Sequence, residues 1–340
     1  LFVGTPTGME RELTAKAGYD YAAVEVSSFQ RRLNGEGIRH NLHALRVLLS
    51  SGRQARAILR EFKPDLVVGT GGYASYPMVK AAAKAGVPTA VHESNMVPGL
   101  TTRMLEDFAD VIMVGFEDCR KHYKHPERIA VTGTPVRGGF FRLRREEARK
   151  KLGFDDEAPL VVSFWGSLGA SHMNECMVDF FRREDSEGYP FRHIHAVGKG
   201  GWDTMEQELR RWGLPKSPRL DVRQYIYDMD VVMAAADVVL CRAGASTISE
   251  LTALGKPTVM VPSPYVTNNH QEKNARLLES HGGAVVITEA DATGDGLYDA
   301  VAGILSHSER RRAMADAMGQ LGIPDATARI YDTVTALVRK

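Results

Sequence analysis

The chain has 340 residues, more than the roughly 250–300 residues at which a single hydrophobic core stops growing, so two domains of about 150 residues each are expected. A composition of 44% hydrophobic and 25% charged residues is that of a globular protein. The net charge of +1 says nothing about partners until the positions of the charges are considered, and we expect no nucleic-acid partner. Three scattered cysteines without a CxxC pair exclude a disulfide framework and favour the reducing cytoplasm, and no apolar run is long enough to span a membrane.

A basic helix is the first distinctive element. Between Arg31 and Lys63, eight Lys or Arg residues stand against two acidic residues. Four apolar residues of this stretch are spaced to share one helix face: Ile38, Leu42, Leu45 and Leu49. Binding to an anionic membrane surface requires such a cationic amphipathic surface. A core-facing helix with a solvated basic face is the alternative, and the sequence favours it.

Short β-branched runs then alternate with helical patterns. The runs are residues 65–69, 88–92, 111–114, 129–131, 160–164, 193–197, 238–241, 258–262 and 284–287. This alternation predicts an α/β fold with doubly wound parallel sheets in two domains. Ligand-binding loops are expected at the carboxyl ends of the strands. A domain boundary is expected near residues 134–137, and residues 324–340 are expected to end in one last helix.

The loop after residues 65–69 contains Gly71, Gly72 and Tyr73, before a helix expected to begin near Pro77. Consecutive glycines let a backbone approach an anion at a helix N-terminus. A tight turn without a ligand is the alternative.

A histidine and a carboxylate meet at the end of the next strand. His92, Glu93 and Asn95 lie there, and a His/Glu pair beside an amide can orient a hydroxyl or accept its proton. A structural histidine is the alternative, and the residue type alone favours it. His92 and Glu93 are nevertheless the candidates for a catalytic base.

Two glycine turns in the second half favour a phosphate ligand. Gly166 and Ser167 follow the strand at 160–164, without a Walker A Lys-Ser/Thr pair or full GxGxxG spacing, which disfavours ATP hydrolysis and NAD binding. Arg242 follows the strand at 238–241, and Glu250 lies about one turn into the next helix. A carboxylate there suits ribose hydroxyls, and an acid that complements the helix dipole is the alternative.

The loop at residues 262–275 is rich in amides and hydroxyls, including Asn269 and Gln271. Amides both donate and accept hydrogen bonds, which suits a sugar.

In this order the loops resemble those of the MurG family of glycosyltransferases over nearly the whole chain. The matching segments are residues 69–73, 92–95 with 99–101, 133–137, 166–170, 241–245 with 249–250, 269–271 with 274–275, and 323–327. No single segment is specific, whereas the series in register is highly specific.

The resemblance implies a GT-B fold, two Rossmann-like domains facing a cleft, with an acceptor- and membrane-facing domain of residues 1–136 plus 325–340 and a UDP-GlcNAc-binding domain of residues 137–324. It implies inverting transfer of N-acetylglucosamine from UDP-GlcNAc to the 4-hydroxyl of an undecaprenyl-linked muramyl-peptide (lipid I to lipid II) in peptidoglycan synthesis. The enzyme would be peripheral, on the cytoplasmic face of the membrane. No metal or other cofactor is implied, so Asp228 and Asp230 are interpreted as helix-start acids.

The resemblance also implies roles for single residues. Glu250 would bind the ribose hydroxyls, Ile226 would pack beside the uracil, and Gln271 would contact the GlcNAc hydroxyls. The other donor-site residues implied are Gly166, Ser167, Arg242, Ala245, Ser246 and His270. Two residues would approach from across the cleft: Asn95 and Arg137. The acceptor loop would comprise Gly71, Gly72 and Tyr73.

Two departures from the family pattern stand out. The family begins with a strand and a GGTGGH loop, whereas this chain begins at Leu1 with a run similar to the family's second strand. A gene start set too late is the expected cause, and a fragment is the alternative. A chain this short would lack a central strand, which puts its activity in question. Trp165 stands where many members have glycine, and its indole is expected to shape the acceptor side.

Three other functions stay open. They are a transferase of this fold acting on another lipid such as diacylglycerol, a UDP-GlcNAc 2-epimerase, and an inactive chain that only binds the UDP-sugar. An epimerase needs a carboxylate placed to deprotonate C2 of the sugar, and it releases free sugar without a lipid acceptor.

Overall fold

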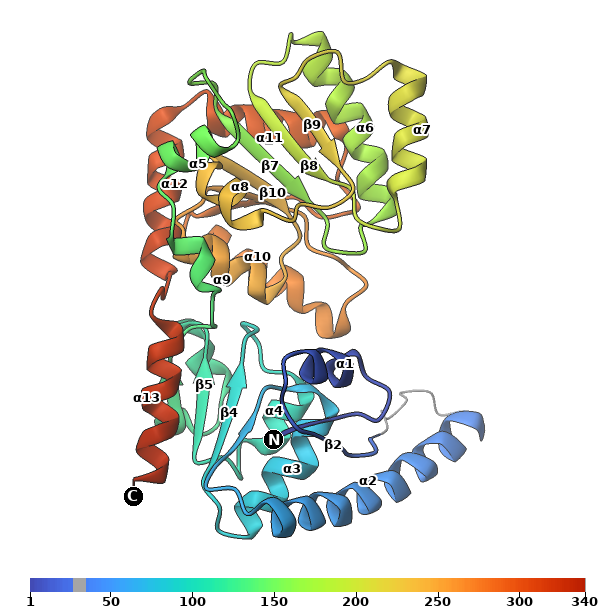
Figure 1. Cartoon of the computed structure of the whole chain (residues 1–340), viewed down its shortest axis with the longest axis vertical. Coiled ribbons are helices and arrows are strands. Elements are labelled where there is room, and N and C mark those ends of the chain that lie inside the picture. Colours follow the sequence, from blue (N-terminus) through green and yellow to red (C-terminus); the bar gives the residue numbers. More distant parts are fainter. Residues whose placement is uncertain (27–34, 340) are drawn as a thin grey trace. The chain divides into compact units, whose positions relative to one another are not determined.

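The computed structural model describes residues 1–26 and 35–339, and in this range the side chains of residues 35–46, 48 and 49 lie outside the description. It divides into two compact units, one formed by Leu1–Gly133 with Ala326–Lys340 and the other by Thr134–Asp325. The sequence placed these boundaries at residues 136 and 325. Each unit contains parallel strands flanked by helices (Figure 1), which confirms the two-domain α/β class.

The first unit holds two parallel sheets. A small sheet pairs β1 (Phe2–Gly4) with β2 (Tyr21–Ala23), and a larger sheet has the order β3-β4-β5-β6. The strands of the larger sheet are β3 (Val67–Gly69), β4 (Thr89–Glu93), β5 (Val111–Val114) and β6 (Ile129–Val131). The α-helices of this unit are α1 (Met9–Lys16), α2 (Gly35–Phe62), α3 (Gly72–Lys84), α4 (Leu100–Leu105) and α13 (Ala326–Val338).

An apolar cavity of about 380 Å³ lies beside β1 and β3, which are end strands of the two sheets. Its lining includes Phe2, Ile58, Phe62 and Val68. Across the described residues, no strand joins the two sheets. The first unit therefore has two separate short sheets in place of one continuous sheet.

Helix α2 contains the predicted basic stretch. The residues predicted to face a membrane lie outside the described side chains: Ile38, Leu42, Leu45 and Leu49. Further along the helix, Ala55 and Leu59 are buried in the core of the first unit. Among the helices that the structure describes, none is both long and apolar enough to cross a membrane. The membrane-facing surface therefore stays a prediction.

The second unit is built on one six-stranded parallel sheet with the order β12-β11-β10-β7-β8-β9. Its strands are β7 (Leu160–Phe164), β8 (Arg192–Ala196), β9 (Leu220–Arg223), β10 (Val238–Cys241), β11 (Thr258–Met260) and β12 (Ala284–Val286). The chain runs outward from β7 to β9, returns to the other side of β7 with β10, and runs outward again to β12. The winding direction therefore reverses between β7 and β10.

Helices cover this sheet on both faces (Figure 1). They are α5 (Arg145–Lys151), α6 (Ser171–Ser186), α7 (Trp202–Trp212), α8 (Met229–Ala235), α9 (Ala245–Ala253), α10 (His270–Ser280), α11 (Gly294–Leu305) and α12 (Ser308–Leu321). The start of α11 lies against α6, because a Cβ at Gly294 would come within 2.6 Å of the carbonyl oxygen of Cys176. The core beneath includes the buried Phe180 and Phe181.

All three cysteines are free thiols and are buried. Cys119 lies in the first unit, and Cys176 and Cys241 lie in the second. No disulfide therefore stabilises either core, and each unit depends on apolar packing and hydrogen bonds.

Candidate functional site

The strand order of the second unit creates a ligand-binding edge after β7 and β10. These strands are neighbours, with Phe164 in register with Cys241, and the chain winds away from them in opposite directions. Ligands of open α/β sheets bind at such a reversal, outside the carboxyl ends of the strands. The residues predicted for a phosphate site follow these two strands.

Glycines shape the loop between β7 and α6. Gly166 and Gly169 have φ angles of +90° and +82°, in the region that favours glycine. A Cβ at Gly169 would lie 2.4 Å from the carbonyl oxygen of Val197, and a Cβ at Gly198 would lie 2.3 Å from the amide nitrogen of Gly169. The loops after β7 and β8 therefore pack backbone to backbone, and Ser167 in the first of them is exposed.

Helix α9 begins directly after the turn that follows β10. Its N-cap residue, Gly244, has no side chain to cap the helix, so the first amide N–H groups, among them those of Ala245 and Ser246, have no side-chain cap. Ser246 is exposed. Such amides, with the helix dipole behind them, attract anions. This helix start is suited to a phosphate oxygen.

Glu250 lies on the second turn of α9 and its side chain is 20% exposed. Burial raises the pKa of its carboxyl group, and the positive charge of Arg137 opposes that rise. Nη2 of Arg137 lies 4.0 Å from Oε1 of Glu250. The resemblance implied that Arg137 approaches from across a cleft, whereas here it belongs to the same unit as Glu250. The Glu250 carboxylate, which can accept hydrogen bonds from hydroxyl groups, and the cationic Arg137 thus lie side by side.

Arg242 was expected to line the phosphate region, and its side chain instead forms a buried ion pair. Nη1 lies 2.7 Å from Oε2 of Glu289 and donates a hydrogen bond of 3.1 Å to the carbonyl oxygen of Val261. Trp165, expected to shape the acceptor side, is 3% exposed and packs in the core of the second unit. The sequence did not single out Glu289, because only the strand order brings it beside the end of β10.

The amide-rich loop between β11 and α10 is held by its own polar groups. Asn268 and Asn269 have φ angles of 57° and 49°, which Asn tolerates better than most residues. The carboxamide oxygen of Gln271 accepts a hydrogen bond of 2.9 Å from the amide of Ser263, and Nδ1 of His270 donates to a backbone carbonyl in the preceding turn. The loop is therefore preorganised at the same edge of the sheet.

The loop between β9 and α8 exposes aromatic rings. Ile226, predicted to pack beside a uracil, is 3% exposed, whereas the neighbouring Tyr225 and Tyr227 are 37% and 87% exposed. Their ring centroids lie 4.9 Å apart. Sequence reasoning missed these tyrosines, although two aromatic residues in a polar loop are a usable signal for base stacking.

Asp228 is the N-cap residue of α8 and lies 3.1 Å from the guanidinium of Arg223, and Asp230 lies in the first turn. Within the described part of the chain, no three His, Cys, Asp or Glu side chains gather as a metal-binding group. Both acids thus have the helix-start positions assigned to them.

In the first unit, the loop after β3 is short and open. Gly71 and Gly72 have φ angles of +85° and +73°, and a Cβ at either would meet nothing within 4 Å. Tyr73 is 54% exposed. Helix α3 begins at Gly72, so the predicted start near Pro77 is wrong. The helix starts earlier because the two glycines complete the turn and Ser75 donates a hydrogen bond to the carbonyl of Gly71.

His92 and Glu93 both make structural contacts after β4. Nε2 of His92 donates a hydrogen bond of 2.9 Å to the carbonyl of Gly133. Both oxygens of the buried Glu93 are engaged: Oε1 accepts from the backbone and side-chain nitrogens of Asn95, and Oε2 accepts from the amide of Gly99 and the hydroxyl of Thr102. These contacts are those of a carboxylate that organises its own loop.

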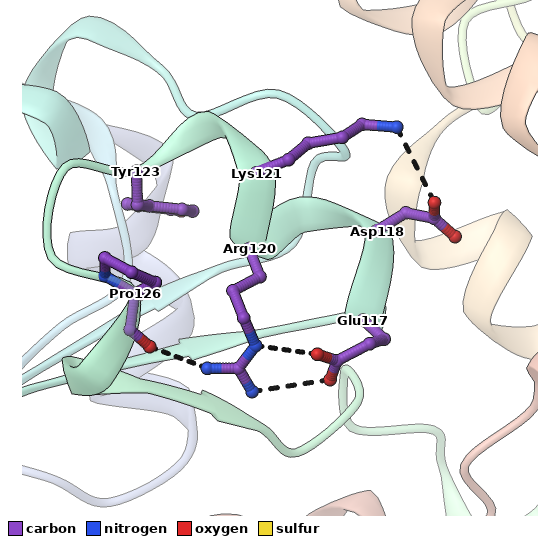
Figure 2. Close-up of a pocket in the computed structure, with 6 residues that line it drawn as sticks. All are labelled: Glu117, Asp118, Arg120, Lys121, Tyr123 and Pro126. Carbon is purple, nitrogen blue, oxygen red and sulfur yellow. Dashed lines mark hydrogen bonds and ion pairs between the residues drawn. The ribbon is translucent and has the colours of Figure 1, made fainter.

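A surface hollow of about 510 Å³ also occurs in the first unit, beside the 3-10 helix Glu117–His122 (Figure 2). The guanidinium of Arg120 lies 2.6 Å from Glu117 and donates to the carbonyl of Pro126, and Lys121 faces Asp118 at 3.6 Å. Its cations are thus neutralised locally. The predicted ligand-binding residues do not line this hollow.

Models of two domains of one protein family match the chain. Residues 2–114 match the N-terminal domain of glycosyltransferase family 28, and residues 160–330 match the C-terminal domain of the same family. Together they cover most of both units.

Curated relatives are similar over the whole chain. A protein of Acetivibrio thermocellus is 40% identical over 339 residues, covering 100% of this chain and 90% of the relative. A protein of Desulforudis audaxviator is 40% identical over 345 residues, with the same coverage. Both are named UDP-N-acetylglucosamine--N-acetylmuramyl-(pentapeptide) pyrophosphoryl-undecaprenol N-acetylglucosamine transferase.

Solved structures share the fold. The crystal structure of Acinetobacter baumannii MurG superposes with a TM-score of 0.77 at 25% identity, covering 98% of this chain and 90% of that one. A UDP-GlcNAc 2-epimerase from Neisseria meningitidis, solved with UDP-GlcNAc bound, has a TM-score of 0.64 at 13% identity with the same coverage, a likeness of fold alone.

Proposed function

Because this chain belongs to the MurG family of glycosyltransferases, we propose that it transfers N-acetylglucosamine from UDP-GlcNAc to the 4-hydroxyl of a lipid-linked muramyl-peptide. The observation that carries the proposal is the edge of the second unit's sheet where β7 and β10 meet. The loop after β7 contributes glycine turns, and the element after the neighbouring β10 contributes an uncapped helix start and a carboxylate.

The donor would be bound entirely by loops of the second unit. The amides of Ala245 and Ser246 would receive a phosphate of the diphosphate, with Ser167 adding a hydroxyl from the neighbouring loop. Glu250 would accept hydrogen bonds from the ribose hydroxyls. The exposed Tyr225 would cover the base, with the backbone of Ile226 beside it. His270 and Gln271 would contact the sugar.

The reaction would be an in-line displacement at the anomeric carbon, with inversion, as the acceptor oxygen attacks and UDP leaves. The negative charge that develops on the leaving diphosphate is stabilised best by donors that are already oriented. The start of α9 would supply such donors from the chain itself, and we propose that no metal ion or cofactor is required. The attacking hydroxyl must also lose a proton. The four hydrogen bonds to Glu93 support a loop-organising role for this residue over that of proton acceptor.

The acceptor would meet the first unit. Gly71, Gly72 and the exposed Tyr73 form an open anion-accessible turn that suits the acceptor's diphosphate, and Asn95 follows the neighbouring strand. The basic stretch of α2 supports peripheral binding to an anionic membrane, which for this lipid acceptor would be the cytoplasmic face.

Label transfer tests the proposal. The chain is incubated with radiolabelled UDP-GlcNAc and an undecaprenyl-linked muramyl-peptide, and label is followed into the lipid phase, with diacylglycerol as the competing acceptor. We expect label in the muramyl lipid alone and a large loss of transfer in Glu250→Ala. Free N-acetylmannosamine would reveal an epimerase, labelled diacylglycerol a different transferase, and UDP-GlcNAc binding without any product a binding protein; each outcome would overturn the proposal.

A further inference from the structure

We propose that Glu289 and Trp165 hold Arg242 as a positioning residue that locks the loops of the donor site together, so that its charge is not offered to the diphosphate. This inference rests on the proposed function, because it assigns a role within the same UDP-sugar site. Neither the family resemblance nor the sequence pattern gave Glu289 a role.

The positions of the three side chains follow from the strand register. Cys241, the last residue of β10, pairs with Phe164 of β7 and with Met260 of β11. The residues that directly follow these three strand ends, Arg242, Trp165 and Val261, are therefore neighbours. Met260 pairs in turn with Val286 of β12, three residues before Glu289. Arg242 therefore lies where the carboxyl ends of four strands meet.

Each neighbouring loop contacts the guanidinium of Arg242. Glu289 approaches to 2.7 Å, the carbonyl of Val261 accepts at 3.1 Å, and the centroid of the Trp165 ring lies 5.8 Å from Cζ. The last distance is within the range of a cation–π contact. One side chain thus links the loops after β7, β10, β11 and β12, and two of these loops carry the proposed phosphate donors.

Burial decides between positioning and direct binding. The side chains of Arg242 and Glu289 are 11% and 8% exposed, and Trp165 is 3% exposed. A buried ion pair is nearly neutral when seen from outside, and removing one partner leaves an uncompensated buried charge. Phosphate binding then depends on the uncapped amides of α9, whose direction the anchored Arg242 fixes from the preceding turn.

The two roles predict opposite effects of the isosteric variant Glu289→Gln. If Glu289 restrains a cation that would otherwise bind phosphate, its neutralisation frees Arg242 and tightens UDP binding. If Arg242 is a positioning residue, the loss of the ion pair loosens the four loops and weakens UDP binding. We expect the second result, a rise of about tenfold in the Kd of UDP.

A second ion pair at the opposite end of the same strand provides the matched control. Arg145 lies 3.0 Å from Asp237, which directly precedes β10, and Asp237 also accepts a hydrogen bond from the amide of Leu160. Asp237→Asn should lower the Tm through the same loss of charge pairing. It should leave the Kd of UDP unchanged, because no proposed ligand contact lies at that end of the sheet.

The experiment measures the Kd of UDP by titration calorimetry and the Tm for the full chain, Glu289→Gln, Asp237→Asn and the double variant Arg242→Met/Glu289→Met. The double variant removes both charges at similar volume, so it keeps the inference testable if Glu289→Gln does not fold. We expect it to melt close to the full chain while binding UDP about tenfold more weakly. Enzyme assays should show the change mainly in KM for the donor.

Unchanged or tighter UDP binding in Glu289→Gln would overturn the inference, as would an equal loss of affinity in Asp237→Asn. If Glu289→Gln does not fold, unchanged or tighter UDP binding in the double variant would overturn it. A wild-type chain that binds no UDP would instead overturn the proposed function, on which the inference rests. The two failures are therefore distinguishable in one set of titrations.

Discussion

Glu250 is a carboxylate whose burial should make UDP binding depend on pH. Burial raises the pKa of its carboxyl group above the usual 4.5 for Glu, and only the ionised form accepts hydrogen bonds at both oxygens from ribose hydroxyls. As pH falls through this raised pKa, we expect the Kd of UDP to increase, beginning at a higher pH than an ordinary Glu would produce. Calorimetry from pH 4 to 8 should show an inflection that Glu250→Gln lacks. A wild-type profile as flat as that of the variant would remove Glu250 from the ribose site.

A substitution at Glu93 distinguishes a positioning role for this residue from an acid–base role. In Glu93→Gln, one carboxylate oxygen becomes an NH2 group that faces donors such as the amide of Gly99 or the hydroxyl of Thr102. We expect the free energy of unfolding to fall by about 1–3 kcal/mol in urea titrations, because buried donors lose their acceptor. If Glu93 were the proton acceptor, kcat would drop by about 100-fold or more in a variant of unchanged stability.

Lys256 should give the second unit an unusual dependence on pH. Its ammonium group donates to the carbonyls of Ala234 and Ala236 at 3.0 and 2.8 Å, near the end of α8, and burial lowers its pKa from 10.5 to about 8. Between these values the unfolded chain binds a proton that the folded chain does not, so stability rises with pH across this window. Relative to Lys256→Met, the wild type should gain on the order of 3 kcal/mol from pH 7 to pH 10.5, measured by urea unfolding. A constant difference would contradict the shift.

At the scale of elements, every predicted run overlaps a strand of the structure. The run at 160–164 has the bounds of β7, a central strand with four fully buried residues, since a continuous apolar run is typical of a strand buried on both faces. The edge strand β9 (Leu220–Arg223) was missed, because Asp221 and Arg223 interrupt its apolar pattern. The three-residue β2 was missed as well, since its sequence Tyr-Ala-Ala contains no β-branched residue.

The contact between the loops after β7 and β8 can be tested with a pair of glycines. Gly198→Ala places a Cβ against the backbone of Gly169 at a φ angle of +89°, which should push the loop that carries Ser167 out of place and weaken UDP binding. Gly213→Ala is the control, because it has the same left-handed strain at a φ angle of +61° but nothing within 4 Å. We expect Gly213→Ala to cost about 1 kcal/mol of stability in thermal melts and to leave UDP affinity unchanged. Equal UDP affinity in both variants would show that the two loops do not need this close approach.

For the molecule as a whole, sequence order predicted which loops gather but not how their side chains pair. Ser167 and Glu250 follow adjacent strands because a doubly wound sheet brings the carboxyl ends of its central strands together. The ion-pair partner of Arg242 could not be predicted from the sequence, because Glu289 is distant in sequence and approaches Arg242 only through the register of β10, β11 and β12. The contacts of Glu93 were hidden for a similar reason: they depend on the path of a loop that has no periodic pattern.

Each unit contains at least one buried cysteine, whose rate of alkylation reports how often that unit opens. Burial raises the pKa of Cys119 to about 11 and that of Cys241 far above its usual range, so neither forms the reactive thiolate while folded. Alkylation of Cys119 therefore times the opening of one unit, and alkylation of Cys176 and Cys241 times the other. Saturating UDP, at about 100 times its Kd, should slow the alkylation of Cys176 and Cys241 roughly 100-fold. The alkylation rate of Cys119 should not change, and peptide mass spectrometry would measure all three rates. Equal slowing of all three cysteines would mean that both halves melt in a single step.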